Sequence, residues 1–222
     1  MRRLYIAAKA PRPGLVKTRL ARTIGADSAV ALYVAFLRDL DARFAAAAVE
    51  PAWFVSPDGC WPEIACAAGI ASGRAHADQG GGSWSDRQDR LFASAARRGE
   101  SPVVLIASDS PQLSTGYVEA AFDRLEDHDV VLGPVHDGGY CLLGMRGYHD
   151  LLRGLAMSTP DVLEAIRHRA AARGLSVALL PETFDVDEVA DLAALAAACQ
   201  QRDDLAETGR ALALTQAGSH RA

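Results

Sequence analysis

The fold is decided by residues 103–111, which read VVLIASDSP. An aliphatic run that stops abruptly at a Ser-Asp-Ser-Pro turn is typical of a fully buried strand in a parallel sheet. Ligands of open α/β sheets bind at the carboxyl ends of such strands, so we expect Asp109 to face a ligand or a metal ion. The structural alternative is that Asp109 caps the helix that begins near Ser114 or hydrogen-bonds within its own turn.

Strand and helix patterns alternate on both sides of this central strand. Short apolar runs indicate further strands at residues 4–8, 52–55, 129–132, 141–145 and 175–180. Apolar residues at helical spacing indicate helices at residues 27–48, 60–68, 87–98, 117–125 and 162–173, and one more after residue 188. We therefore predict a single-domain, Rossmann-like three-layer α/β/α fold with a mostly parallel sheet. The segment 133–140 breaks the simple doubly wound order.

Length and composition fit one domain. A chain of 222 residues, half of them apolar, can bury one sizeable core, which we assign to residues 1–214, with a disordered tail at 215–222. The net charge of −5 and the scattered basic residues predict neither a nucleic-acid partner nor a membrane surface. The four cysteines lack metal-ligand spacing, which predicts reduced thiols. Because Lys9 and Pro11 interrupt the first apolar run, it is too short for a signal peptide, and we expect a cytoplasmic protein.

A basic loop follows the first predicted strand. It reads KAPRPGLVKTRL, and its charged residues are Lys9, Arg12, Lys17 and Arg19. The prolines and Gly14 bend the backbone so that amide groups can face a ligand, while the cations can neutralise phosphate charge. The pattern is not a P-loop, because the glycine-lysine-serine signature is absent. This loop predicts a phosphate-binding site; a solvated basic surface is the structural alternative.

Two further aspartates come late in the chain. Asp185 and Asp187 alternate in an extended segment and therefore point to one side. Either could join Asp109 around a Mg²⁺ or Mn²⁺ ion, which usually takes one or two carboxylates, with phosphate oxygens and water in the other positions. A helix N-cap is the structural alternative for Asp187.

Two glycine-containing segments are further candidates. In the Asp137-Gly138-Gly139-Tyr140 turn, the glycines permit close approach of a ligand, and Asp137 could hold a hydroxyl group; a plain β-turn is the alternative. The glycine run in residues 79–83 is the most flexible-looking internal segment and a candidate for a mobile lid. Signature motifs of serine hydrolases, zinc proteases and dinucleotide-binding proteins are absent.

Taken together, these blocks resemble a known family. KTRL, SDSP and DGGY occur in this order, followed by Ser158-Thr159 and residues 185–192. They resemble a bacterial family of GT-A-like, glycosyltransferase-like proteins of unknown function, some of them from arsenosugar gene clusters. That family is related to molybdenum-cofactor and phospholactate guanylyltransferases. The resemblance covers nearly the whole chain.

The resemblance implies a nucleotide-diphospho-sugar transferase fold with its nucleotide over the first strands. It implies phosphate contacts at Lys9, Lys17 and Arg19 and metal ligands at Asp109 and Asp187. The acceptor side is expected at Asp137, Gly138, Gly139, Ser158 and Thr159, with Ser158 or Thr159 also expected as a helix N-cap. Two positions depart from the family: Met157 replaces a tryptophan, and residues 85–90 replace a Gly-Glu-Arg-Met-like block. These departures predict an altered acceptor or reduced activity.

Three functions are compatible with this pattern. The leading hypothesis is a Mg²⁺-dependent or Mn²⁺-dependent transfer of a nucleotidyl group from a nucleoside triphosphate to a phosphorylated or hydroxyl acceptor, with release of pyrophosphate. Lys17, Arg19 and Asp109 would be its catalytic residues. The alternatives are glycosyl transfer from a nucleotide sugar, and nucleotide binding without catalysis. The expected partners are therefore a nucleotide or nucleotide sugar and a small-molecule acceptor; the oligomeric state is left open.

Overall fold

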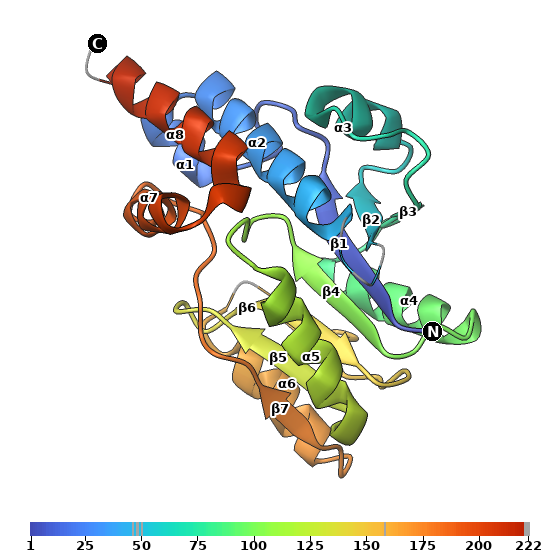
Figure 1. Cartoon of the computed structure of the whole chain (residues 1–222). Helices are drawn as coiled ribbons and strands as arrows, with labels where there is room; N and C mark the ends of the chain where they lie inside the picture. The colour runs from blue at the N-terminus through green and yellow to red at the C-terminus, as the bar shows by residue number, and fades with distance from the viewer. Residues whose placement is uncertain (46, 48, 50, 158, 220–222) are drawn as a thin grey trace.

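A computed structural model of the protein describes residues 1–45, 47, 49, 51–157 and 159–219. Within this part of the chain, one sheet has the strand order β3-β2-β1-β4-β6-β5-β7 (Figure 1). The strands are β1 (Arg3–Lys9), β2 (Pro51–Ser56), β3 (His76–Asp78), β4 (Val103–Ala107), β5 (Val130–Pro134), β6 (Tyr140–Met145) and β7 (Val177–Leu179). Strand β6 runs antiparallel to both of its neighbours, whereas the other pairs are parallel. The sheet is therefore mostly parallel, as predicted.

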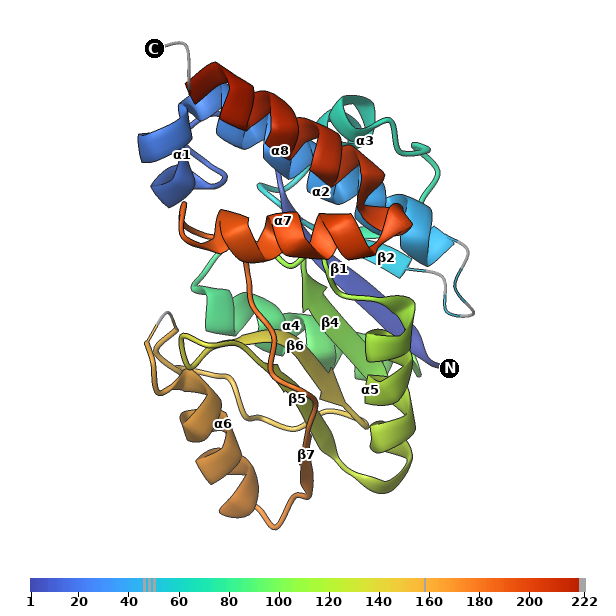
Figure 2. The ribbon, with the colours of Figure 1, turned by 60° about the vertical axis from the view of Figure 1, so that its left-hand side comes forward.

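Helices cover both faces of this sheet. They are α1 (Thr18–Ile24), α2 (Ala26–Ala45), α3 (Trp61–Ala68), α4 (Trp84–Arg97), α5 (Thr115–Asp127), α6 (Val162–Ala171), α7 (Asp191–Gln201) and α8 (Ala206–Ser219), with a 3₁₀ turn, η1 (Asp203–Leu205), before α8. Helices α2, α3, α5, α7 and α8 pack on one face, whereas α4 and α6 pack on the other. Figure 2 shows α8 lying along α2. This arrangement confirms the three-layer α/β/α fold.

Strand β4 lies between β1 and β6 and is buried from both faces. Val104 and Ile106 enter the core under α2 and α5, while Val103 and Leu105 enter the core under α4 and α6. This alternation follows from the two-residue repeat of a strand. The strand ends just before Asp109, so this aspartate lies at the carboxyl edge of the sheet.

The antiparallel strand β6 explains the break in the alternating pattern. Only the short turn that contains Asp137 and Gly138 separates β5 from β6, and a parallel crossover needs a dozen or more residues. The chain must therefore return in the opposite direction. The turn thus stays close to the edge at which β5 ends.

Two predicted boundaries differ from the structure. Helix α6 has Asp161 as its N-cap residue, so Thr159 is not the cap, and Ser158 lies outside the described residues. The disordered tail predicted from Thr215 is wrong for residues 215–219, which belong to α8. The first turn of α8 is held by the buried carboxylate of Asp39 on α2, which accepts hydrogen bonds from backbone N–H groups at the start of α8.

Among the described helices, none combines the length and the apolar composition that a membrane span requires.

Candidate active site at the carboxyl edge of the sheet

Lys17 is at the centre of the candidate site. Its side chain is only 1% exposed, and its Nζ lies 2.6 Å from Oδ1 of Asp109 and 3.7 Å from Oδ1 of Asp187. The ammonium group also donates a hydrogen bond of 2.5 Å to the backbone carbonyl of Val186. The structure thus brings together one residue from each of the three distant segments that the sequence singled out.

The backbone of Lys17 supports this inward position. Lys17 precedes α1 and has φ 48° and ψ 41°, in the left-handed region that residues other than glycine seldom adopt. Such a conformation persists only where the surrounding structure holds it, and it is concentrated at functional sites. The ion pair with Asp109 and the hydrogen bond to Val186 hold the side chain here.

The two acidic segments are joined directly to one another. The backbone N–H of Val186 donates a hydrogen bond of 3.0 Å to the carbonyl of Asp109. The buried side chain of Gln112 donates to the carbonyl of Phe184 and, at 3.2 Å, to the hydroxyl of Thr183. Sequence reasoning missed Gln112, because nothing in its local pattern indicates a partner this far along the chain.

Arg43 on α2 also holds the loop that carries Asp109. Its guanidinium, almost fully buried, donates hydrogen bonds to the carbonyls of Pro111, at 2.6 Å, and Leu113, at 2.9 Å. It also pairs with Asp204 of η1. The loop that carries Asp109 is therefore fixed to the helical layer.

The carboxyl groups of this site are crowded. Burial, and then the charges of the nearby Asp187 and Asp137, together raise the pKa of Asp185 to about 6, against the opposing effect of Lys17. Burial also raises the pKa of Asp187, an effect that Lys17 opposes and Asp109 reinforces. A site with more carboxylates than cations favours an additional positive charge.

The donor set fits a hard divalent cation. Asp109 and Asp187 are each a little over 40% exposed, so their carboxylates can reach solvent and ligand. Within the described part of the chain, no three His, Cys, Asp or Glu side chains are clustered as ligands of one metal ion. Mg²⁺ commonly takes only one or two protein carboxylates and fills its other positions with phosphate oxygens and water. The Asp109–Asp187 pair meets that requirement.

The other cations of the basic loop divide into two groups. Arg19 is exposed and lies 3.8 Å from Asp187 and 3.8 Å from Glu188, so its guanidinium borders the carboxylates and faces solvent. Lys9 is also exposed, at the end of β1. Arg12 instead binds Glu63 of α3 at 2.5 Å, and this hydrogen-bonded pair raises the pKa of Arg12. Arg12 therefore fastens the loop to α3.

Gly14 occupies an exposed turn with φ +79°, and a Cβ atom there would meet no neighbouring atom. Its role is to permit the turn that precedes Lys17. In the structure the basic loop is thus a folded segment with one inward cation, one fastened arginine and two exposed cations.

The Asp137–Tyr140 turn packs closely against the chain before α6. Gly138 has φ +83°, and a Cβ atom on it would lie 1.9 Å from the carbonyl oxygen of Pro160. The N–H of Gly138 donates to the carbonyl of Val135 at 3.1 Å, as expected for a β-turn, and the N–H of Gly139 donates to the side chain of Asp137 at 2.8 Å. Asp137 and Thr159 are exposed, so this turn can meet a second ligand beside Asp185.

Two family departures meet at one hydroxyl group. The buried amide of Gln88, on α4, donates to the hydroxyl of Tyr140 at 2.8 Å. The same hydroxyl lies 3.9 Å from the sulfur of Met157. Sequence reasoning noted both departures but did not connect them, because their contact depends on Tyr140.

The glycine-rich segment after β3 is tied to α4. Arg90 donates to the carbonyls of Gln79, at 2.6 Å, and Gly81, at 2.7 Å, and Arg87 donates to that of Gly82 at 3.0 Å. Two arginines of α4 therefore hold this segment in the structure, and its role as a lid stays a prediction.

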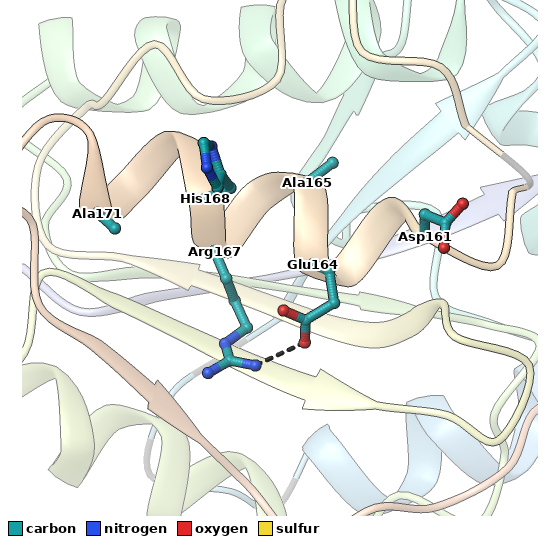
Figure 3. A pocket seen from close by; sticks show the side chains of 6 residues that line it. All are labelled: Asp161, Glu164, Ala165, Arg167, His168 and Ala171. Atoms are coloured by element: carbon teal, nitrogen blue, oxygen red, sulfur yellow. Dashed lines mark hydrogen bonds and ion pairs between the residues drawn. The ribbon is translucent and has the colours of Figure 1, made fainter.

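A separate surface depression follows the outer side of α6 (Figure 3). It is lined by Asp161, Glu164, Ala165, Arg167, His168 and Ala171. Glu164 and Arg167 form an exposed ion pair of 2.5 Å beside it. None of these residues belongs to the Lys17 cluster, and an exposed ion pair of this kind contributes little binding energy. We therefore assign no chemistry to this depression.

Solved structures share the fold and identify the class of protein. A crystal structure of a "putative nucleotide-diphospho-sugar transferase" from Desulfovibrio desulfuricans G20 has a TM-score of 0.90 and 29% sequence identity, and the match covers 99% of this chain and 97% of that chain. A cytidylyltransferase from Leptospira borgpetersenii serovar Hardjo-bovis shares the fold with a TM-score of 0.56 at 13% identity, over 98% of this chain and 94% of that chain. The protein is a transferase with the nucleotide-diphospho-sugar transferase fold.

Sequence comparison identifies the family. Residues 20–159 match the family described as "Uncharacterized protein conserved in bacteria (DUF2064)". A 3-phospho-D-glycerate guanylyltransferase from Phenylobacterium zucineum (strain HLK1) is 36% identical over 183 residues, which are 78% of this chain and 80% of the relative. The chain belongs to the DUF2064 family, in agreement with the resemblance seen in its sequence blocks.

Proposed function

We propose that the protein transfers a nucleotidyl group from a nucleoside triphosphate to a small acceptor and releases pyrophosphate. The observation that carries this proposal is the cluster of Lys17, Asp109 and Asp187 at the carboxyl edge of the sheet, with Arg19 beside it. Open α/β sheets bind their ligands at this edge. The guanylyltransferase relative supports the choice of nucleotidyl transfer.

Asp109 and Asp187 would hold the metal ion, Mg²⁺ or Mn²⁺, with Asp185 next to them. When bound, such an ion supplies positive charge that neutralises and orients phosphate oxygens. The exposed carboxylate oxygens of this pair and its crowding with Asp185 support the assignment.

The chain's own residues would act by binding and orienting the substrates. Arg19 and Lys9 are exposed cations that can bind phosphate oxygens, and Lys17 adds a third positive charge within the cluster. In the reaction an acceptor oxygen forms a bond to the α-phosphorus, while the bond from this phosphorus to the oxygen bridging the α- and β-phosphates breaks. The electron pair leaves with pyrophosphate, whose growing charge the cations stabilise.

The acceptor would lie at the Asp137–Gly139 turn and Thr159. A phosphorylated acceptor suits this site, because an ionised phosphate oxygen attacks without first losing a proton to a base. GTP and 3-phospho-D-glycerate, the substrates implied by the relative's name, are the first pair to test.

The test measures pyrophosphate release. The protein is incubated with Mg²⁺, 3-phospho-D-glycerate and each of GTP, ATP, CTP and UTP in turn, and the product is identified by mass spectrometry. Arg19→Met and Arg12→Met form a matched pair, because both remove one charge from the same loop and only Arg19 borders the cluster. We expect acceptor-dependent pyrophosphate with at least one triphosphate, and a larger loss in Arg19→Met.

Other outcomes would contradict this proposal. Nucleoside diphosphate released from a sugar nucleotide, without pyrophosphate from any triphosphate, would indicate glycosyl transfer. Nucleotide binding that yields neither product with a panel of phosphorylated and hydroxyl acceptors would indicate a binding protein. Equal losses in the two arginine variants would remove the role assigned to Arg19.

A further inference from the structure

Lys17 is an unusual cation for a phosphate site, because its ammonium is already bound. Three oxygen atoms, from Asp109, Asp187 and the carbonyl of Val186, lie within 3.7 Å of Nζ. The ring of Phe36 lies on another side, with its centroid 5.6 Å away. The side chain is enclosed by protein groups rather than presented to solvent.

The same two carboxylates are the proposed ligands of the metal ion. A divalent cation bound to Asp109 would meet the ammonium group, which is only 2.6 Å from one oxygen of that carboxylate. Positive charges this close repel each other strongly, because the site is partly shielded from water. The two cations therefore compete for the same oxygens.

The geometry points to a second role for Lys17: it is an internal counter-ion that occupies the carboxylates until a nucleotide arrives and suppresses metal binding in the nucleotide's absence. This inference rests on the proposed function, because it requires Asp109 and Asp187 to bind a metal ion. The triphosphate offers the ammonium new anionic partners. Metal and nucleotide binding are then positively coupled through one side chain.

The composition of the chain makes this role directly measurable. Lys9 and Lys17 are the only lysines in the sequence, which otherwise uses arginine for its positive charges. Lys9 is exposed, whereas Lys17 is 1% exposed. Amine-specific labelling therefore reports on one free and one enclosed ammonium group in the same loop.

The first experiment labels the wild-type protein briefly with acetic anhydride and measures both lysines by peptide mass spectrometry. Without metal, we expect Lys9 to react and Lys17 to be protected. Saturating Mn²⁺ without nucleotide should displace the Lys17 ammonium and raise its labelling severalfold, while Lys9 changes little. Unchanged protection of Lys17 at Mn²⁺ concentrations that fill the site would overturn the inference.

The second experiment measures Mn²⁺ affinity from the electron paramagnetic resonance signal of the free ion. It compares the wild type with Lys17→Met and Arg19→Met, each with and without the α,β-methylene analogue of GTP. Both variants remove one positive charge, but only Lys17 contacts Asp109. In the absence of nucleotide, we expect Lys17→Met to bind Mn²⁺ about tenfold tighter than the wild type and Arg19→Met to change much less. The affinity gained from the nucleotide analogue should shrink in Lys17→Met.

The outcomes separate this inference from the proposed function. If the wild type binds no Mn²⁺ even with the nucleotide analogue, the metal-dependent function itself fails. If the wild type binds Mn²⁺ but Lys17→Met binds it no tighter, or if both variants tighten equally, only the counter-ion role fails. Circular dichroism checks the fold of each variant, and the labelling experiment needs no variant.

Discussion

Gly138→Ala is the sharpest test of the packing on the acceptor side. The residue has φ +83°, and the added methyl carbon would lie 1.9 Å from the carbonyl oxygen of Pro160. That oxygen belongs to the backbone and cannot rotate away, so the turn or the chain before α6 must move. Gly147→Ala is the matched control, because Gly147 has φ +84° and a Cβ atom there would meet nothing within 4 Å.

Both variants place alanine in a left-handed backbone conformation, but only Gly138→Ala also creates a steric overlap. Placing alanine in a left-handed conformation costs about 1–2 kcal/mol at either position. At Gly138 the overlap with Pro160 adds about 1–3 kcal/mol, the usual range for overpacking. We therefore expect Gly138→Ala to lower the free energy of unfolding by about 2–5 kcal/mol and Gly147→Ala by about 1–2 kcal/mol.

Urea denaturation followed by tryptophan fluorescence and circular dichroism measures both values. Displacement of the turn also moves Asp137, so in the pyrophosphate assay the KM for the acceptor should rise more than the KM for the triphosphate. Equal destabilisation of the two variants would refute the proposed clash. A larger change in the triphosphate KM would refute the placement of the acceptor at this turn.

Three further predictions concern the remaining polar contacts. Asp109→Asn should reduce pyrophosphate formation by at least about a hundredfold while the circular dichroism spectrum stays unchanged. If the variant turns over at the wild-type rate, the assignment of Asp109 to the active site is wrong. Gln112→Ala removes a buried donor to the carbonyl of Phe184, so it should lower the free energy of unfolding in urea by about 1–3 kcal/mol and weaken Mn²⁺ binding. If the variant keeps the wild-type Mn²⁺ affinity, Gln112 contributes to stability and has no effect on metal binding. Hydrogen bonds from the backbone N–H and hydroxyl of Ser176, then from Arg146, hold the pKa of Asp129 well below its usual range. The stability that Asp129 contributes is present above its unfolded-state pKa of about 3.9 and is lost as the pH falls toward its folded-state pKa. Asp129→Asn should therefore lower the free energy of unfolding more at pH 7 than at pH 3. The same decrease at both pH values would contradict this prediction.

Local patterns were sufficient to predict the centre of the fold. Strand β4 and the position of Asp109 follow from an aliphatic run and the turn after it, both contained in residues 103–111. The weaker elements could not be predicted in this way. Strand β3 has only three residues, and helix α8 depends on a cap from Asp39, far away in the sequence. In both cases, tertiary contacts supply what the local sequence lacks.

The same limit applies within the candidate site. Composition identified a basic loop, but it could not determine which cation turns inward. Lys17 turns inward to contact Asp109 and Val186, whereas Arg12 contacts Glu63 on α3. These partners are distant in sequence, so composition and spacing alone could not separate the four cations, and only the family resemblance set Arg12 apart.

The two departures from the family are one structural feature. A buried amide without partners costs about 1–3 kcal/mol, so Gln88 is tolerated because its amide donates to the hydroxyl of Tyr140. Met157, at the position where the resemblance leads us to expect a tryptophan, reaches the same hydroxyl. The hydroxyl of Tyr140 therefore links Gln88 of α4 to Met157, which lies before α6. Because both positions contact one hydroxyl group, a substitution at either of them changes the surroundings of the other through Tyr140.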